Sequence, residues 1–232
     1  VVSCNYLVYG VDLEAMAKFQ DVIMIEHFGL PRYEKQESLL INGALTMRTA
    51  RALIGSTPLS VDPYDQGIGF GGVYPARRFQ QGIFEAAAAG SSMVVKGTEF
   101  VEDGEFTLLT AQRFGPHREA IGAAHRYLLK NADLFGGDRY NAAPVGLLYP
   151  EDQLWQNWRK FAPAFFGAGQ TLLKAGIPWK GVRPGEDLAQ LQVLLTFTGE
   201  TLKDLPPNLR VIEVPSLPGW ELPEPRGLGR AP

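Results

Sequence analysis

Hydrophobic runs alternate with segments of helical spacing along the first hundred residues of the chain. Short apolar runs bounded by turn residues are typical of buried strands, and apolar residues recurring every three or four positions indicate amphipathic helices. Buried strands that alternate with helices form a parallel sheet covered by those helices. The pattern therefore predicts an α/β fold, with strands at 1–10, 21–29, 57–64 and 91–100 and helices at 12–20, 39–55 and 76–90.

Glycine and proline mark the ends of these predicted helices. Gly55 and Gly90 follow the last helical positions, where glycine readily adopts the left-handed conformation that stops a helix. Pro75 suits the start of the helix that Gly90 ends. A polar, hairpin-like stretch, a long helix and a linker are expected next, at 101–109, 116–135 and 136–141.

A second α/β rhythm begins at Ala143. We predict a helix at 151–175, with Pro163 as a bend, between strands at 143–150, 177–182, 193–199 and 209–215. This part resembles a small flavodoxin-like layered domain. The proline-rich end is expected to be an extended arm on a surface. The predicted organisation is therefore a first domain, a flavodoxin-like domain and a tail, at 1–141, 142–215 and 216–232.

Charge and cysteine content exclude several classes of protein. The formal net charge is −3, which gives no electrostatic reason to expect nucleic acid or an anionic membrane as a partner. The single cysteine, Cys4, rules out an intrachain disulfide and a multi-cysteine metal site. No apolar run approaches the roughly 20 residues that span a bilayer. The chain opens on VVSCNYLVYG without a signal-peptide pattern, so we expect a cytoplasmic protein and a piece of a longer polypeptide.

The four strands of the first part are too few to close a parallel barrel, which needs eight. We favour part of a barrel whose other half is missing. The alternative is a complete open sheet, whose unpaired edge groups something must cover.

Acidic and aromatic residues gather at the predicted strand ends, where parallel α/β folds carry their chemistry. Carboxylates serve as nucleophile and proton donor in glycoside hydrolysis, and sugar faces stack on aromatic rings. The pattern therefore indicates sugar chemistry, with candidate residues Asn5, Glu26, His27, Asp62, Tyr64 and Glu99.

Several stretches in order resemble the C-terminal half of the family 42 glycoside hydrolases, retaining enzymes of β-galactosidase type. They are SCNYL, DVIMIEHFGLP, ALTMRTARALIGSTPLSVDPYDQG, FQQGIFEAAAAGSSMVVKGTEF, GAAHRYL and APVGLLYPEDQLW. The resemblance implies the last four strands of a catalytic (β/α)8 TIM barrel followed by a flavodoxin-like trimerisation domain. It also implies a carbohydrate substrate, no cofactor, and either a homo-oligomer or an N-terminal barrel half as partner.

The resemblance assigns roles to individual residues. The family's nucleophilic Glu falls on Asp62, which is one methylene shorter and is therefore a departure from the family pattern. Glu26 corresponds to the acidic residue of the sixth barrel strand near the sugar, and Glu99 lies where the eighth strand lines the pocket. Asn5, His27 and Tyr64 complete the implied sugar site. The family's general acid would lie before Val1, outside this chain.

Other interpretations of these residues stay open. Asp62 precedes Pro63, and Asp-Pro commonly starts a turn. Glu99 could pair with Lys96 or Arg113, and His27 could be a buried structural histidine. No metal site is expected, because His117 and His125 have the wrong spacing for a ligand pair. The run GIGFGG at 67–72 lacks the context of a dinucleotide fingerprint, so we interpret it as a flexible active-site loop.

Two other functions remain as alternatives to the enzyme. A non-catalytic sugar-binding or assembly module could keep the fold after losing the acid and shortening the nucleophile. An open sheet that binds a nucleotide is the third possibility.

Overall fold

The computed structural model divides the chain into two compact units, Val1–Gly29 with Asn42–Asn141 and Leu30–Ile41 with Ala142–Pro232. It describes residues 3–7, 12–26, 36–62, 68–69, 72–73, 75–95, 98–100, 106–135, 142–199 and 202–214. Within these ranges, none of the helices combines the length and apolarity needed to cross a membrane.

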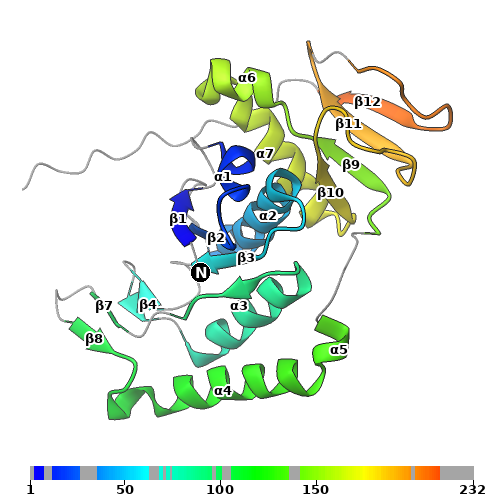
Figure 1. Cartoon of the computed structure of the whole chain (residues 1–232). Coiled ribbons are helices and arrows are strands. Elements are labelled where there is room, and N and C mark those ends of the chain that lie inside the picture. Colours follow the sequence, from blue (N-terminus) through cyan, green and yellow to red (C-terminus); the bar gives the residue numbers. More distant parts are fainter. Residues whose placement is uncertain are drawn as a thin grey trace, which may run out of the picture. The chain divides into compact units, whose positions relative to one another are not determined.

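The first unit contains a four-stranded parallel sheet whose strands follow one another in chain order (Figure 1). Its strands are β1 (Ser3–Leu7), β2 (Val22–Glu26), β3 (Leu59–Asp62) and β6 (Ser92–Met93). The helices between them are α1 (Leu13–Ala17), α2 (Gln36–Ile54) and α3 (Ala76–Ala88). A doubly wound sheet reverses its strand order at a switch point, whereas a barrel wall does not. The described strands of this sheet therefore contain no switch point.

One face of this sheet is buried. Ile23, Ile25, Leu59 and Val61 are each at most 3% exposed, and they alternate along β2 and β3 with half-buried Met24 and Ser60. Leu45 and Ala50 of α2 and Phe79 and Ile83 of α3 belong to the same class of fully buried side chains. The described residues therefore form a core on one face and leave the other face less covered, unlike a complete parallel sheet, which is covered on both faces.

The helix ends follow the sequence signals in part. Gly55 and Gly90 both have a positive φ, as expected of residues that stop a helix. Pro75 is the N-cap of α3 and precedes its first helical residue.

The fourth strand is shorter than the sequence predicts. Instead of spanning 91–100, β6 covers only Ser92–Met93, and its last contact with β3 is a hydrogen bond from the Val94 amide to the Val61 carbonyl (2.7 Å). Residues Thr98–Phe100 form β7, which pairs antiparallel with β8 (Phe106–Leu108). A partner only a few residues away closes a short loop at low entropic cost, and this favours the local hairpin over a longer parallel strand.

A second small hairpin occupies the glycine-rich segment. β4 (Ile68–Gly69) pairs antiparallel with β5 (Gly72–Val73), and α3 begins only at Ala76. The described residues of the GIGFGG run, 68–69 and 72, therefore belong to short antiparallel strands, whereas a dinucleotide fingerprint joins a parallel strand directly to a helix.

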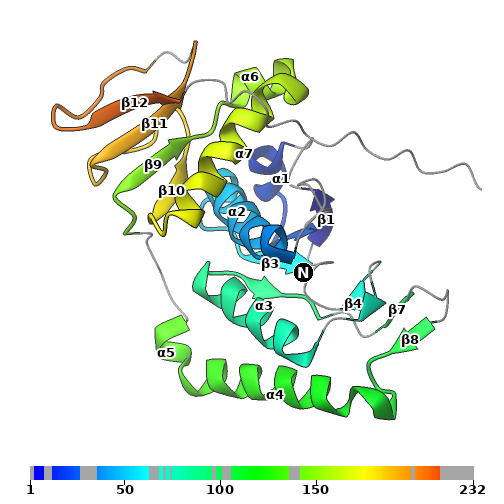
Figure 2. The same ribbon diagram turned by 180° about the vertical axis from the view of Figure 1, so that it is seen from behind.

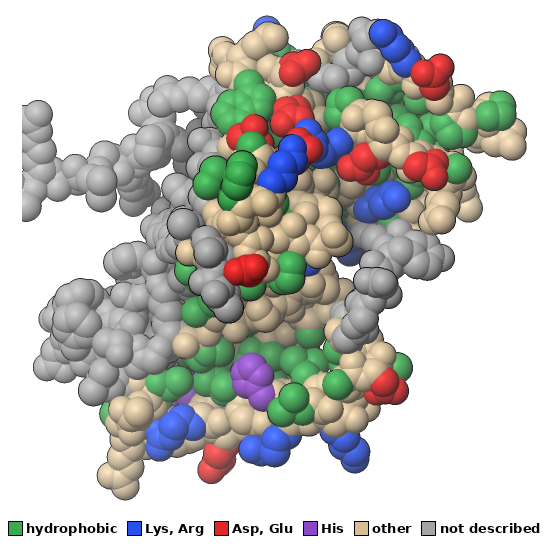
Figure 3. Space-filling view, in the orientation of Figure 1, with side chains coloured by type: hydrophobic (Ala, Val, Ile, Leu, Met, Phe, Trp, Pro, Cys, Tyr) green, Lys and Arg blue, Asp and Glu red, His purple; other side chains and the backbone are tan. Residues whose placement is uncertain are grey.

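The predicted helix at 116–135 is two helices, α4 (Gly115–Lys130) and α5 (Ala132–Phe135). Asn131 separates them, and its side chain donates a hydrogen bond to the Tyr127 carbonyl (2.7 Å). α4 lies alongside α3 in both views (Figures 1 and 2). Edge-to-face ring contacts join the two helices, with 5.5 Å between the Phe84 and Tyr127 centroids. Charged side chains gather on the other side of α4, along the lower border of this unit (Figure 3).

The second unit is a four-stranded parallel sheet in the order β10-β9-β11-β12. Its strands are β9 (Val145–Leu148), β10 (Trp179–Val182), β11 (Val193–Phe197) and β12 (Arg210–Val214). Phe165 of the main helix packs edge-to-face on Tyr149 (5.3 Å between centroids) and contacts Phe197. Leu148, Val182 and Leu194 of the strands belong to a second cluster, which residues of the connecting segments complete: Leu188, Leu191, Leu202 and Leu209.

The helical segment of this unit breaks at a different place from the predicted one. We predicted one helix at 151–175 with a bend at Pro163, but the segment consists of α6 (Glu151–Gln156) and α7 (Trp158–Lys174). Asn157 lies between them, and its side chain accepts a hydrogen bond from the Lys160 amide (3.1 Å). Asparagine caps a helix by accepting such bonds, so a new helix starts there, and Pro163 lies inside α7.

Candidate functional site

Two acidic residues are neighbours at the carboxyl-terminal edge of the first sheet. Glu26 is the last residue of β2 and Asp62 is the last residue of β3, and the two are register partners. Register partners on adjacent strands lie about 4.8 Å apart in the hydrogen-bonding direction. The ends of β2 and β3 therefore bring Glu26 and Asp62 together at the edge where parallel α/β folds place their chemistry. We refer to these two residues as the acidic pair.

A second row of residues crosses the sheet two positions before the acidic pair. Asn5 pairs with Met24, Met24 with Ser60, and Ser60 with Ser92, so the row spans all four strands. Residues two apart on a strand share a face, so this row and the acidic pair occupy the same, less covered face. Met24 and Ser60 are half-buried and Ser92 is exposed. We refer to Asn5, Met24, Ser60 and Ser92 as the second row.

The structure brings some of the predicted site residues together and leaves others apart. Glu26, Asp62 and Asn5 belong to adjacent strands of one sheet face. Glu99 does not end a strand of this sheet, because it lies in β7 opposite Thr107 of the antiparallel hairpin. His27 and Tyr64 lie outside the described residues.

The opposite end of the sheet is held by an arginine that sequence analysis did not single out. Arg51, in the last turn of α2, donates hydrogen bonds to the carbonyls of Gly55 (3.0 Å), Thr57 (2.8 Å) and Gly90 (2.7 Å). Burial lowers the pKa of its guanidinium below the usual value. The three bonds join the loops that lead into β3 and β6, so this end of the sheet serves stability. Its only sequence signal was an arginine one turn before a helix-ending glycine.

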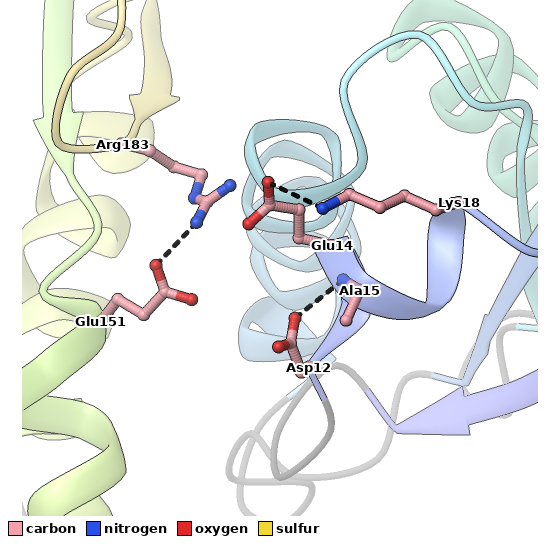
Figure 4. A network of polar contacts seen from close by, with 6 residues as sticks. All are labelled: Asp12, Glu14, Ala15, Lys18, Glu151 and Arg183. Carbon is pink, nitrogen blue, oxygen red and sulfur yellow. Dashed lines mark hydrogen bonds and ion pairs between the residues drawn. The ribbon is translucent and has the colours of Figure 1, made fainter.

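Other polar contacts are structural (Figure 4). In the first unit, the Asp12 side chain accepts a hydrogen bond from the Ala15 amide (2.9 Å) and caps α1, and Lys18 lies 3.9 Å from Glu14. In the second unit, Arg183 pairs with Glu151 at 2.8 Å. Among the residues that the structure describes, no group of three or more His, Cys, Asp or Glu side chains could hold a metal ion.

The carboxyl-terminal edge of the second sheet carries a different set of polar groups. Gln153 of α6 donates a hydrogen bond to the Thr198 carbonyl (2.9 Å), and the Thr198 hydroxyl donates to Glu213. Burial of Tyr149, together with the nearby Glu151 carboxylate, raises the pKa of the phenol well above its usual value, against a smaller lowering effect of Arg183. These contacts tie α6 to the ends of β11 and β12.

A shallow, open depression also lies along α3, lined by residues that include Arg77, Gln80, Phe84 and Glu85. All of these residues come from one helix, far in sequence from the acidic pair. We therefore place the candidate site at the strand ends and not in this depression.

Comparison with known structures gives the same fold. The chain aligns with a β-galactosidase from Bacillus circulans sp. alkalophilus with a TM-score of 0.60 and 15% identity, over 85% of this chain and 32% of that one. It aligns with Gan42B, a GH42 β-galactosidase, with a TM-score of 0.59 and 14% identity, over 81% and 30% of the two chains. A β-galactosidase from Rahnella sp. R3 gives a TM-score of 0.59 and 12% identity, over 85% and 33%.

At these identities the likeness concerns the fold. The chain spans about a third of the length of the β-galactosidases that it resembles. Its sequence matches no protein-family model. It also matches no curated protein. The mixed α/β architecture with parallel sheets that the sequence predicts is confirmed, and its structural neighbours are β-galactosidases.

Proposed function

We propose that this chain is the C-terminal part of a GH42-type β-galactosidase, a half (β/α)8 barrel followed by a flavodoxin-like domain. The observation that carries the proposal is the acidic pair, two register-partnered carboxylate residues on the open face of a sequentially ordered parallel sheet. A retaining glycosidase needs a carboxylate nucleophile facing the anomeric carbon, and in this proposal Asp62 supplies it while Glu26 lies beside it in the sugar pocket. The fold likeness to β-galactosidases supports the same class of substrate.

In this proposal Asp62 is the nucleophile of a retaining mechanism. Its carboxylate attacks the anomeric carbon while the bond to the leaving oxygen breaks and a general acid donates a proton to that oxygen. Water then attacks the glycosyl ester, gives up a proton to the same group, and releases the sugar with Asp62 regenerated. Glu26 and Asn5 line the sugar pocket beside Asp62, with His27, Tyr64 and Glu99 as further contributors.

The proposal requires a second polypeptide segment. The family resemblance assigns the general acid to a barrel strand before Val1, so in this proposal it comes from the other half of the barrel. That half would also pair with the edges of β1 and β6 and cover the less buried face that carries Met24 and Ser60. An N-terminal barrel half therefore completes the site.

The second unit is proposed as a flavodoxin-like assembly domain. Numbered within the unit, its strand order is 2-1-3-4, which matches the first four strands of the flavodoxin order. It departs from that fold in its last two crossovers, which contain turns and no helix in the described residues 183–192, 198–199 and 202–209. A role in forming a homo-oligomer fits an exposed Trp155 (56%) and an exposed edge strand β12.

One observation favours a second candidate function. Asp62 stands where the glycosidases of this type carry Glu, and the shorter side chain withdraws the carboxylate from the sugar. A non-catalytic sugar-binding or assembly module would keep the fold and lose turnover. The same experiment separates the two candidates.

The test uses the protein expressed from its complete reading frame and p-nitrophenyl β-D-galactoside as substrate. We expect Asp62→Asn to lower kcat by at least about 1,000-fold, because a nucleophile is lost. The matched control is Asp21→Asn, an exposed aspartate at the other end of β2, which should keep wild-type turnover. Equal rates for the wild type and Asp62→Asn would contradict the enzymatic function. Galactose binding without turnover would support the non-catalytic module.

A further inference from the structure

Three of the four residues in the second row, all except Met24, are small or polar, at positions where a barrel is normally filled with bulky apolar residues. The row reads Asn5, Met24, Ser60 and Ser92 across the four strands. On the other face, the corresponding positions of β2 and β3 are Ile23, Ile25, Leu59 and Val61, all buried. Closed barrels pack their interior with Val, Ile and Leu side chains. Two serines side by side on β3 and β6 leave room that such residues would fill.

Closing the barrel would bury this row, and buried hydroxyl groups need hydrogen-bond partners. The neighbours of Ser60 along the row are Met24 and Ser92, and a methionine side chain offers only a weak acceptor. The two serine hydroxyls can bond to each other, but each also has further hydrogen-bonding capacity, which the other half, water or a ligand would satisfy. A polar and roomy site of this kind is one that water or ligand hydroxyls occupy.

The distance between the second row and the acidic pair matches the size of one sugar ring. Ser60 precedes Asp62 by two residues, which is about 6.6 Å along a parallel strand. Ser92 is the register partner of Ser60, about 4.8 Å away on the next strand. A pyranose whose anomeric carbon meets Asp62 would thus direct its far hydroxyl groups to the two serines.

On the basis of the proposed function, we propose that Ser60 and Ser92 form the floor of the sugar site and determine its specificity. Their hydroxyls hydrogen-bond the ring hydroxyls farthest from the anomeric carbon, directly or through one water. The ligand class is a single hexopyranosyl unit bound end-on, with its reducing carbon at the acidic pair. The floor selects sugars that carry a hydroxyl group at that far end.

The experiment measures kcat/KM of the protein expressed from its complete reading frame on p-nitrophenyl β-D-galactoside and on analogues that each lack one ring hydroxyl. We expect Ser60→Ala to lower kcat/KM by about 10-fold, the loss of one hydrogen bond. Ser60→Val should cost about 100-fold, because it also fills the space. For one deoxy analogue, the wild-type penalty should disappear in Ser60→Ala, which assigns the hydroxyl that Ser60 binds. Galactose binding is measured in parallel by calorimetry.

Ser56→Ala and Ser56→Val are the matched controls, because Ser56 is an exposed serine in the turn before β3. They should keep wild-type kinetics and affinity. Suppose that the wild-type protein hydrolyses or binds galactosides and that the Ser60 variants behave like the Ser56 variants. The proposed role of Ser60 in the sugar site is then wrong, and the proposed function stands. If the wild-type protein neither hydrolyses nor binds galactosides, both proposals are wrong. If the wild-type protein binds galactose without turnover and Ser60→Val loses that affinity, the proposed role of Ser60 is supported and only the enzymatic function is wrong.

Discussion

Single residues at the two ends of the first sheet have different roles. At the carboxyl-terminal edge, Glu26 and Asp62 are adjacent acidic residues. At the other end, Arg51 donates three hydrogen bonds to carbonyl groups of two loops. A charged donor forms stronger hydrogen bonds than a neutral one, and arginine can serve several acceptors at once because its guanidinium presents five N–H groups.

The Arg51 contacts predict a loss of stability on substitution. Arg51→Ala removes the shared donor and leaves the carbonyls of Gly55, Thr57 and Gly90 without it, so we expect the free energy of unfolding to fall by about 1–3 kcal/mol. Arg77→Ala, at an exposed position of α3, is the control and should change it by less than about 0.5 kcal/mol. Urea titration followed by circular dichroism measures both. Equal midpoints for the two variants would contradict the structural role of Arg51.

Tyr149 predicts how the second unit responds to alkali. The residue is 8% exposed, and burial raises the pKa of its phenol above the value near 10 that an unfolded chain shows. Above about pH 10 the unfolded state loses this proton while the folded state keeps it, so stability is full below that pH and falls as pH rises. Tyr149→Phe should flatten this alkaline fall, as measured by thermal melts from pH 8 to 11. Tyr127→Phe, at a half-exposed position of α4, should leave it as steep as in the wild type.

At the scale of elements, strand β9 depends on a residue without a side chain. A methyl group on Gly146 would lie 2.5 Å from Leu191 Cδ1 and 3.2–3.3 Å from Leu194 and Val182 side-chain atoms. These three residues belong to the hydrophobic cluster on this face of the second sheet. Close packing of the cluster onto the strand therefore requires glycine at this position.

The crowding at Gly146 predicts the effect of a single added methyl group. Gly146→Ala forces Leu191 out of its position in a packed cluster, and overpacking of this kind costs about 1–3 kcal/mol of the free energy of unfolding. In Gly115→Ala, the nearest atom to the new methyl is 4.0 Å away, so that variant should be neutral or slightly stabilising. Differential scanning calorimetry compares the two. A neutral Gly146→Ala would show that the cluster repacks freely.

Local patterns predicted the elements better than their exact ends. The alternation in VIMIE and LSVD was sufficient to place β2 and β3 and their terminal acids, because a buried face imposes a period of two. The breaks at Asn131 and Asn157 were missed because apolar spacing continues across them, while the Asn131 side chain bonds the end of α4 and the Asn157 side chain caps the start of α7. The position of Glu99 depended on which partner strand competed for residues 98–100, and single-chain periodicity does not contain that information.

At the scale of the whole molecule, the two units have separate cores and separate sheets. The second unit buries Trp179, Phe165 and Leu147 completely. The first unit keeps a sheet face on which Met24 and Ser60 are only half-buried. The second row could not be predicted from local sequence patterns, because pairing Ser60 with Ser92 requires the register of strands more than 30 residues apart.

The separate cores predict independent folding of the second unit. A fragment of residues 142–232 should unfold in one cooperative transition and retain a near-ultraviolet circular dichroism band from buried Trp179. The same fragment with Trp179→Phe should lose most of that band, which assigns the signal. A fragment that shows no cooperative transition would mean that residues outside it, such as Leu30–Ile41, are needed for its fold.

The two-residue alternation along β3 also determines what an insertion or deletion would do there. Leu59 and Val61 belong to the buried side of the sheet, and Ser60 to the opposite side. Removing one residue inside this strand would exchange the two sides, so that the serine hydroxyl would face hydrocarbon while leucine and valine would face away from the core. Insertions and deletions should therefore be tolerated in the turn at Ser56, but at Ser60 within β3 they should strongly destabilise the fold.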